Sequence, residues 1–510
     1  MLKKIMCLWL CCMGSLACLP AQPMNGTCGT IGQYAQPLKQ RLLLNQNQAK
    51  GNPVQFRNTM YIPVKFHIVA QDDGTGAVHY RDVLDQLTAI NNDFAPLNMQ
   101  FYLHGELNQL RSTGIYANHM NNGARMDSLR DRNAINIWIV KNPSPFSQDD
   151  GLVLGFYHPQ RDWIVMLKEE INARSSTLPH ELGHFFSLMH THYGWDADPW
   201  QASRHGNPAP ERSPGGIPTE RQDRSNCEVA GDYICDTPPD YNFGYFWITN
   251  CAYNGGAMDP TGVLVKPSES NFMGYFFSCP RSAYHFSSQQ QLIIQTDYAE
   301  PLRNYLRIGY TPTHTSIVGN MQLLAPAAGA TVAFYNAVTL EWNAPAGATR
   351  YLVEIDRVPN FGLQPTSMIV AGNSITIDNL EPNRQYYWRV RPFNEYVTNR
   401  GFSAVRNFRT GDVTTATHDL KQLSAWSLYP NPVASDETLT LMLDMREGLE
   451  AQLTMHSATG QVIQNIGKQQ LRPGTNMVQI PLNGMPAGLY VLVLQSEQGR
   501  MARRLVVQPR

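Results

Sequence analysis

The residues with the clearest chemistry lie in one run of eleven, from His180 to His190. Residues four apart share one face of a helix, so His180 and His184 can direct two imidazoles at a single ion. Zinc accepts such nitrogens at about 2.0–2.1 Å. Glu181 lies off that face, so it suits a general base beside the metal better than a ligand. His190 can join the site only if the helix ends after His184, and the run then predicts a catalytic zinc site.

The spacing of this run resembles that of the metzincin metallopeptidases, His-Glu-x-x-His-x-x-Gly-x-x-His, at every position except the glycine. Ser187 stands at the glycine position, where the helix must turn. If that turn needs a positive φ, a non-glycine residue costs about 1 kcal/mol there. His192 is a rival third ligand, although its spacing fits no known pattern. The plain alternative, a helix with ordinary surface or core histidines, does not explain the glutamate and the third histidine together.

A second motif, Asn271–Tyr275, follows downstream, where metzincins place a methionine turn below the metal. A third, Gly-Asp-x-x-x-Asp-Thr-Pro at 231–238, lies between the two, and with all three motifs residues 59–308 resemble the pappalysin family. The resemblance implies that Met273 forms a hydrophobic floor and that Tyr275 hydrogen-bonds the oxyanion that develops during hydrolysis. A core methionine and a packed tyrosine are the plain alternatives.

Relatives of this kind use the Gly-Asp stretch in a structural calcium site. Carboxylate and carbonyl oxygens suit a hard cation. The expected calcium ligands are therefore Asp232, Asp236 and the Thr237 carbonyl. A turn capped by aspartate is the alternative interpretation.

The N-terminus has the residue order of a secretory signal peptide. Two lysines precede an apolar stretch at 5–16, and small residues follow it. This stretch is shorter than the roughly 20 apolar residues that a membrane span needs. We predict a signal peptide over residues 1–21 with cleavage after Ala21, a competing site lying before Cys18. No other stretch predicts a transmembrane span.

Four of the nine cysteines lie in the signal segment, so five remain in an exported chain. Four of these cluster beyond the zinc run, and export would oxidise them to two disulfides. Three pairings are possible, of which Cys227–Cys235 and Cys251–Cys279 is preferred.

The odd thiol is Cys28, in a pro-segment over residues 22–58 that we call the leader. Similar family members are made as latent zymogens, some of them with a leader cysteine on the zinc. A thiolate binds zinc well, at about 2.3 Å. Our hypothesis is that Cys28 is a latency switch, removed by cleavage near Arg57. A disulfide to another chain and an unused thiol are the alternatives.

The elements that must position these residues follow from periodicity. The expected strands cover residues 62–69, 135–140 and 163–167, with helices over 83–94 and from about Thr177. We therefore predict a multidomain chain, with an α/β (α+β) metzincin-type catalytic domain at 59–308 followed by two all-β sandwich domains.

The first sandwich is expected at 320–412, where Trp342 and a Leu-Glu-Pro stretch before Tyr386 resemble a fibronectin type III module. The second is expected at 425–510. Its Leu428–Pro432 opening and the later Gly and Pro turns resemble the C-terminal sorting domain of type IX secretion substrates. That resemblance implies secretion machinery as a partner and a location outside the cell or at its surface.

Length and charge limit the remaining function classes. A chain of 510 residues predicts two to four folded units, and a net charge of −1 gives no electrostatic case for nucleic acid or an anionic membrane. We predict a secreted zinc endopeptidase that acts on proteins or peptides and is made as a latent zymogen. A non-catalytic zinc-containing surface adhesion protein and a zinc hydrolase of another bond are the alternatives. Phe276–Ser278 supply no carboxylate after the methionine turn, so no preference for basic residues is predicted.

Overall fold

The computed structural model describes residues 26–510, apart from several short stretches. These are 52, 55, 108, 146–151, 247–250, 278, 308, 311, 313–314, 363–364, 414–419, 421, 458–461, 498 and 510. The predicted signal peptide at 1–21 and Ser278 lie outside the described residues. Within them, no helix combines the length and the apolar character that crossing a membrane requires.

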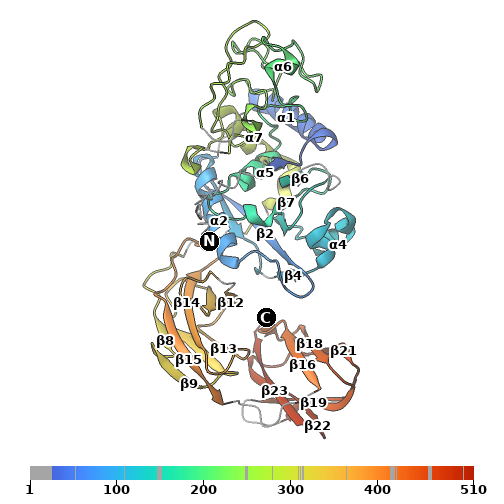
Figure 1. Ribbon diagram of the computed structural model, residues 1–510, viewed down its shortest axis with the longest axis vertical. Coiled ribbons are helices and arrows are strands. Elements are labelled where there is room, and N and C mark those ends of the chain that lie inside the picture. Colours follow the sequence, from blue (N-terminus) through green and yellow to red (C-terminus); the bar gives the residue numbers. More distant parts are fainter. Residues whose placement is uncertain are drawn as a thin grey trace, which may run out of the picture.

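The N-terminal half is an α/β module built on one seven-stranded sheet (Figure 1). Along the main path the strand order is β1-β6-β7-β5-β2-β3, and β4 also pairs with β2. The strands are β1 Gly26–Cys28, β2 Met60–Ala70, β3 Met99–Leu103, β4 Gln109–Arg111, β5 Ile135–Val140, β6 Leu152–His158 and β7 Trp163–Leu167. Only the β6–β7 pairing is antiparallel among the described strands of this sheet. The predicted strands at 62–69, 135–140 and 163–167 are confirmed.

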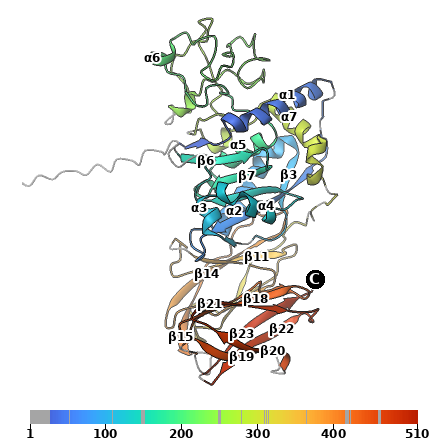
Figure 2. The same cartoon turned by 90° about the vertical axis from the view of Figure 1, so that its right-hand side faces the viewer.

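Seven α-helices are described in the α/β module. They are α1 Ala35–Gly51, α2 Tyr80–Phe94, α3 Thr113–Ala117, α4 Gly123–Leu129, α5 Thr177–Phe185, α6 Ala202–His205 and α7 Ser288–Ala299. The apolar stripe of α2 predicted from periodicity is buried, and it shares one core with β2, β5 and α5. The helix α1 of the leader lies beside α7 in both views (Figures 1 and 2).

The segment between α5 and α7 has little regular structure, and two disulfides crosslink it. They join Cys227 to Cys235 and Cys251 to Cys279, with Cα–Cα separations of 5.1 and 4.6 Å. This is the pairing that the sequence analysis preferred. A cluster of aromatic side chains that includes Trp195 and Trp200 forms a small core of its own there.

The first sandwich contains two sheets, β13-β10-β8 and β12-β11-β14-β15-β9. Its strands are β8 Leu323–Ala325, β9 Ala330–Phe334, β10 Val338–Trp342, β11 Arg350–Asp356, β12 Thr366–Val370, β13 Ser374–Ile377, β14 Gln385–Phe393 and β15 Arg406–Val413. Trp342 and Trp388 are fully buried between the sheets. The Tyr386 hydroxyl accepts a hydrogen bond from the Glu381 N–H at 2.9 Å, which is the kind of contact that a tyrosine corner makes.

The second sandwich lies at the C-terminal end of the molecule (Figure 2). Its sheets have the orders β16-β18-β21 and β17-β23-β22-β19-β20. The strands are β16 Leu423–Tyr429, β17 Val433–Ala434, β18 Thr438–Met445, β19 Leu449–Ser457, β20 Val462–Leu471, β21 Gly474–Pro481, β22 Gly488–Ser496 and β23 Gly499–Gln508. The predicted order of a mixed α/β region followed by β-sheet domains is therefore confirmed.

The first sandwich packs directly against the α/β module. Leu352 and Phe393 of the sandwich belong to the same apolar cluster as the core around α2. Arg391 forms an ion pair with Asp85 of α2 at 2.6 Å. These contacts hold the first sandwich against α2 and the core around it.

Candidate metal centre

Helix α5 is buried along its whole length, from Thr177 to Phe185. One face carries His180 and His184, and the opposite face packs into the core. The helix ends after Phe185, and Ser187 adopts a left-handed φ of 73°. The Leu188 N–H then donates to the Gly183 carbonyl at 2.9 Å, which closes the turn. The chain reverses there, as the placement of His190 in the site requires.

The three predicted imidazoles converge on one point. Their Nε2 atoms lie 3.1 Å apart for His180 and His184, 3.0 Å for His184 and His190, and 3.1 Å for His180 and His190. The Cys28 sulfur joins them in a cluster whose ligand atoms all lie within 4.8 Å of one another. Three aromatic nitrogens and one thiol are the donor set that zinc prefers, so the residues fit zinc. The rival ligand His192 is not in this cluster.

Each imidazole is oriented by a contact of its second nitrogen. The Nδ1 of His180 lies 2.6 Å from the Phe272 carbonyl, and the Nδ1 of His184 lies 2.8 Å from the Leu188 carbonyl. These acceptors require Nδ1–H, which leaves the Nε2 lone pair free to bind a metal. The pKa values agree, because burial lowers that of His180 to about 4 and that of His184 well below its ordinary range.

Asp196 orients the third imidazole, that of His190, in the same way. This role was not predicted from the sequence. The Oδ1 of Asp196 lies 2.5 Å from His190 Nδ1, and its Oδ2 accepts the Gly194 N–H at 2.9 Å. A carboxylate behind a ligating histidine fixes the ring and makes it more basic. The only available signal was an aspartate six positions after His190.

Glu181 is fully buried beside this cluster. Thr30 of the leader donates to its Oε2 at 3.5 Å, and its Oε1 has no hydrogen-bond partner among the described residues. Gly155 of β6 leaves the room for this carboxylate, because a Cβ there would lie 2.7 Å from Oε1. Burial raises the pKa of Glu181 to about 8, although hydrogen bonds from Cys28 and Thr30 act in the opposite direction.

The methionine turn lies directly below α5. Met273 is fully buried, and its carbonyl accepts the Thr191 N–H at 3.2 Å. A Cβ at Gly183 would collide with the Met273 sulfur, so the glycine inside α5 is what allows this close approach. Met273 therefore packs closely against the histidine helix at Gly183.

Tyr275 reaches the cluster from the same turn. Its hydroxyl lies 3.5 Å from His190 Nε2 and accepts the Cys28 N–H at 3.0 Å. The ring stands edge-on to His192, with centroids 4.3 Å apart. Both nitrogens of His192 lack a hydrogen-bond partner among the described residues. His192 belongs instead to a second group of possible ligands, with His190 and Asp196, and its Nδ1 lies 3.7 Å from an Asp240 carboxylate oxygen.

The leader fills the space in front of the cluster. Strand β1 pairs in parallel with β6, and the Thr30 N–H donates to the Cys28 sulfur at 3.3 Å. Burial raises the pKa of the Cys28 thiol, and the negative charge of Glu181 adds to the effect. A divalent cation would act in the opposite direction, because it favours the thiolate. Only about 20 Å³ of space remains between Cys28, Glu181 and Tyr275.

The carboxylates of the predicted calcium ligands Asp232 and Asp236 have different hydrogen-bond partners. Asp232 is fully buried and accepts from the Thr237 hydroxyl at 2.9 Å. Asp236 turns to the start of α7, where it accepts from Ser287 and from the Gln289 N–H. Glu220 is a further buried carboxyl of this region, because burial and then the charge of Asp232 raise its pKa, while burial and the charge of Asp236 raise the pKa of Asp232. Sequence reasoning missed Glu220, which carries no local motif.

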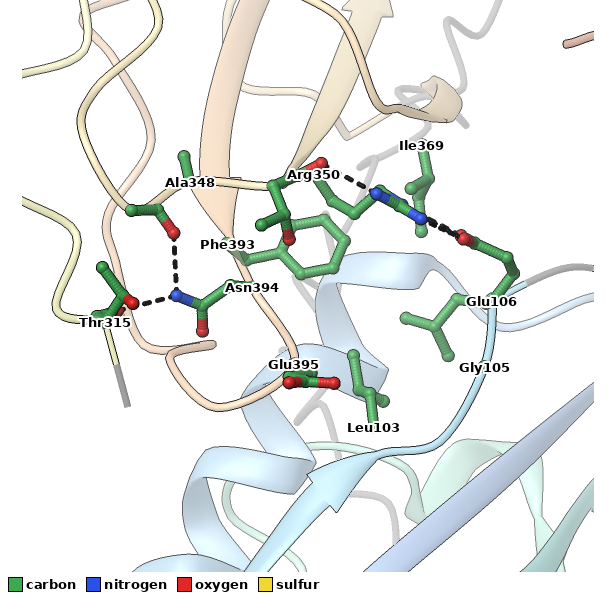
Figure 3. Close-up of a pocket in the computed structure, with 13 residues that line it drawn as sticks. Leu103, Gly105, Glu106, Thr315, Ala348, Arg350, Ile369, Phe393, Asn394 and Glu395 are labelled. Atoms are coloured by element: carbon green, nitrogen blue, oxygen red, sulfur yellow. Dashed lines mark hydrogen bonds and ion pairs between the residues drawn. The ribbon is translucent and has the colours of Figure 1, made fainter. Parts of the chain in front are cut away.

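A larger cavity of about 570 Å³ lies where the first sandwich meets the α/β module (Figure 3). Arg350 pairs with Glu106 across it, and Asn394 donates to the carbonyls of Thr315 and Gly347 at 2.8 and 2.9 Å. None of the residues lining this cavity belongs to the histidine cluster. Its polar side chains serve the contact between the domains.

Comparison with known proteins addresses the two ends of the chain separately. Residues 427–508 match the family described as the secretion system C-terminal sorting domain. The second sandwich is a type IX secretion sorting domain. The protein is accordingly directed to the cell surface or the extracellular space.

Two curated relatives connect the chain with extracellular metalloproteases. An extracellular metalloprotease of Colletotrichum graminicola is 28% identical over 218 residues, covering 38% of this chain and 71% of the relative. Extracellular metalloprotease 1 of Coccidioides posadasii is 24% identical over 292 residues, covering 52% of this chain and 89% of the relative. The chain is therefore a distant homologue of extracellular metalloproteases.

Solved structures with fibronectin type III modules are also similar to this chain. The FN1–FN3 domains of chicken CNTN1 are 14% identical over 37% of this chain and 66% of theirs, with a TM-score of 0.15. The fn3 domain of the human collagen alpha-1(XX) chain is 24% identical over 21% of this chain and 98% of its own, also at 0.15. Scores this low carry no argument about the fold.

Proposed function

We propose that this protein is a secreted zinc endopeptidase of the pappalysin kind that hydrolyses peptide bonds in proteins. The observation that carries the proposal is the convergence of three imidazole nitrogens at 3.0–3.1 Å from one another beside a buried glutamate. The proposal assigns catalysis to residues 59–308, a fibronectin type III-like module to 320–412 and the signal peptide to 1–21. The distant likeness to extracellular metalloproteases points to the same chemistry.

His180, His184 and His190 would hold the zinc, and Asp196 would keep the third ring in place. Zinc supplies Lewis-acid chemistry, since it polarises a carbonyl and makes water acidic enough to react near neutral pH. Glu181 takes a proton from the attacking water and delivers it to the leaving amine. The Tyr275 hydroxyl donates a hydrogen bond to the oxyanion. In the precursor the oxygen of this hydroxyl accepts a hydrogen bond from the Cys28 N–H.

A non-catalytic zinc adhesin is the second candidate, because the two sandwiches are folds often used for binding. Burying an ionisable group such as Glu181 without full hydrogen bonding is costly. A purely structural metal site gains nothing from such a buried carboxylate, whereas a catalytic site needs one as its general base. A zinc hydrolase of another bond would use the same groups, so the assay substrate is a protein.

Removing zinc from the processed chain is expected to abolish cleavage of a denatured protein, and adding back one equivalent of zinc should restore it. Without zinc, the three imidazoles hold no Lewis acid that could polarise the scissile carbonyl of the substrate. Gel electrophoresis of casein incubated with the processed, chelated and reconstituted chain measures the effect. Equal cleavage before and after complete zinc removal would contradict the proposal.

Latency is the second part of the proposal. The Cys28 sulfur lies with the three imidazoles in one cluster whose ligand atoms are within 4.8 Å of one another, and β1 pairs with β6. Cys28→Ala should therefore raise the peptidase activity of the uncleaved precursor by at least about tenfold, because a thiolate ligand would otherwise occupy the open position that catalytic zinc needs. Hydrolysis of a quenched fluorescent peptide by intact precursor provides the measurement. A Cys28→Ala precursor as latent as the parent would remove the thiol from the mechanism.

Calcium is proposed at the predicted ligands Asp232, Asp236 and the Thr237 carbonyl, where Asp232 lies together with a further carboxyl, Glu220. Asp232 and Glu220 are both buried, burial raises the pKa of each, and Glu220 Oε1 has no hydrogen-bond partner among the described residues. A hard cation would neutralise them with oxygen ligands. Calcium added to the stripped chain is thus expected to raise the melting temperature by several degrees, measured by differential scanning calorimetry. An unchanged melting temperature would contradict the calcium proposal. Glu220→Gln is the matched variant for this measurement.

A further inference from the structure

The leader holds the α/β module through a second contact, away from the metal centre. Helix α1 lies across the end of α5 and beside α7 (Figure 2). Leu38 and Leu42 are buried in the same apolar core as α5, and Leu44 on the outer face of the helix is 68% exposed. Because α1 buries one face, it is bound as an amphipathic helix on the surface of the module that includes Phe185, Ser187 and Asp297, which we call the α1 groove.

The centre of this groove is charged and buried. Arg41 of α1 donates to both oxygens of Asp297 at 2.7 and 2.6 Å, and also to the Phe185 carbonyl at 3.1 Å. Asp297 is in turn paired with Arg303, whose side chain is fully buried. Removing α1 would leave two acidic side chains, Asp297 and Asp162, around the single guanidinium of Arg303. Without α1, the groove would therefore carry one negative charge that only a further cationic group could neutralise.

One turn further along α1, Asn45 contacts the zinc motif itself. Its Nδ2 donates to the Ser187 hydroxyl at 2.8 Å and to Asp297 at 2.9 Å. Ser187 has the positive φ of 73° at which glycine would be free of strain. A glycine there would have no hydroxyl for Asn45. The one departure from the metzincin pattern thus has a structural role, which is to bind the leader.

We propose that this groove is a helix-binding site that retains the leader after cleavage near Arg57, so that the excised leader remains bound as an inhibitor. The ligand it takes is an amphipathic helix with arginine and asparagine four positions apart, and its occupant is α1 of the same chain. The contacts of Arg41 and Asn45 do not depend on the covalent link, and Arg57 itself is exposed. The proposal rests on the latency proposed above, and it adds that a cut at Arg57 alone does not produce an active enzyme.

The experiment uses the full chain with Glu181→Ala, so that a failure of the proposed catalysis cannot affect the result. A recognition sequence for a site-specific protease is inserted after Arg57, and the chain is cut there. Size-exclusion chromatography followed by mass spectrometry then measures how fast the leader fragment leaves. We expect the fragment to co-elute with the body of the protein, and Cys28→Ser to leave it bound.

Two variants test the groove from opposite sides. Arg41→Ala and Ser187→Gly should each speed the loss of the fragment, the first by at least about tenfold, which corresponds to about 1.4 kcal/mol. Leu44→Ala, on the exposed face of α1, is the matched control and should change nothing. Ser187→Gly relieves backbone strain, so it keeps the test valid even if Arg41→Ala impairs folding. A fragment that leaves the cut parent chain at once, or that stays as long in both variants as in the parent, would overturn the proposal.

Discussion

Replacement of Glu181 by alanine in the processed chain is expected to lower kcat/KM for peptide hydrolysis by about 10²–10⁴-fold, which is the range that a general acid–base group contributes. The carboxylate is buried next to the three imidazoles, and its Oε1 has no partner among the described residues. It is therefore placed to exchange protons with the reacting groups. Initial rates on a quenched fluorescent peptide, at several substrate concentrations, measure the loss.

The control for this prediction is the zinc content. Glu181 lies off the histidine face, so Glu181→Ala should bind one zinc per chain as the parent does, by atomic absorption. Glu169→Ala removes an exposed carboxylate elsewhere and should keep full activity. Undiminished hydrolysis by zinc-loaded Glu181→Ala would exclude the glutamate as the base and leave the adhesin interpretation in place.

The sequence predicted the parts of the site that depend on local spacing. His180 and His184 follow from the helical repeat, and the turn at Ser187 follows from the need to bring His190 back. The structure places all three imidazoles together, with Ser187 at the positive φ that this turn requires. Motifs of this kind are readable because each residue's role is determined by neighbours a few positions away.

What sequence reasoning missed depends on contacts between distant segments. Asn45 and Ser187 are 142 positions apart, and Arg41 and Asp297 are 256 apart. Such pairs leave no periodic signal in one sequence, because either side chain alone suggests an exposed polar residue. The strand pairing of β1 with β6 was missed for the same reason, since the leader has little periodicity. Asp236 was assigned to calcium from its motif, which gave no sign of the hydrogen bond that it accepts from Ser287 at the start of α7.

The second large effect is expected on stability, at the buried ion pairs between α7 and the C-terminal end of the α/β module. Asp297 is 2% exposed in its side chain and pairs with Arg303 at 2.9 Å and Arg41 at 2.6 Å. Removing one partner of a buried pair leaves the other charge uncompensated, at a cost of about 3–5 kcal/mol. Asp297→Ala should therefore destabilise the α/β module by about that amount, whereas Glu228→Ala, which removes an exposed pair with Lys50, should have no measurable effect.

The pH dependence of this effect follows from the pKa of Asp297. Burial raises that pKa, but the guanidinium groups of Arg303 and Arg41 outweigh burial, so the folded value lies below the ordinary one. A lowered folded pKa means that the contribution is complete above the unfolded value of about 3.9 and is lost as the pH falls through the folded value. The difference between parent and Asp297→Ala should thus be constant near neutral pH and shrink below about pH 4. Hydrogen exchange of β5 and β7 peptides at several pH values measures it for the α/β module alone. If the stability difference between the parent and Asp297→Ala grew on acidification, the ionised carboxylate of Asp297 would not be what stabilises the fold.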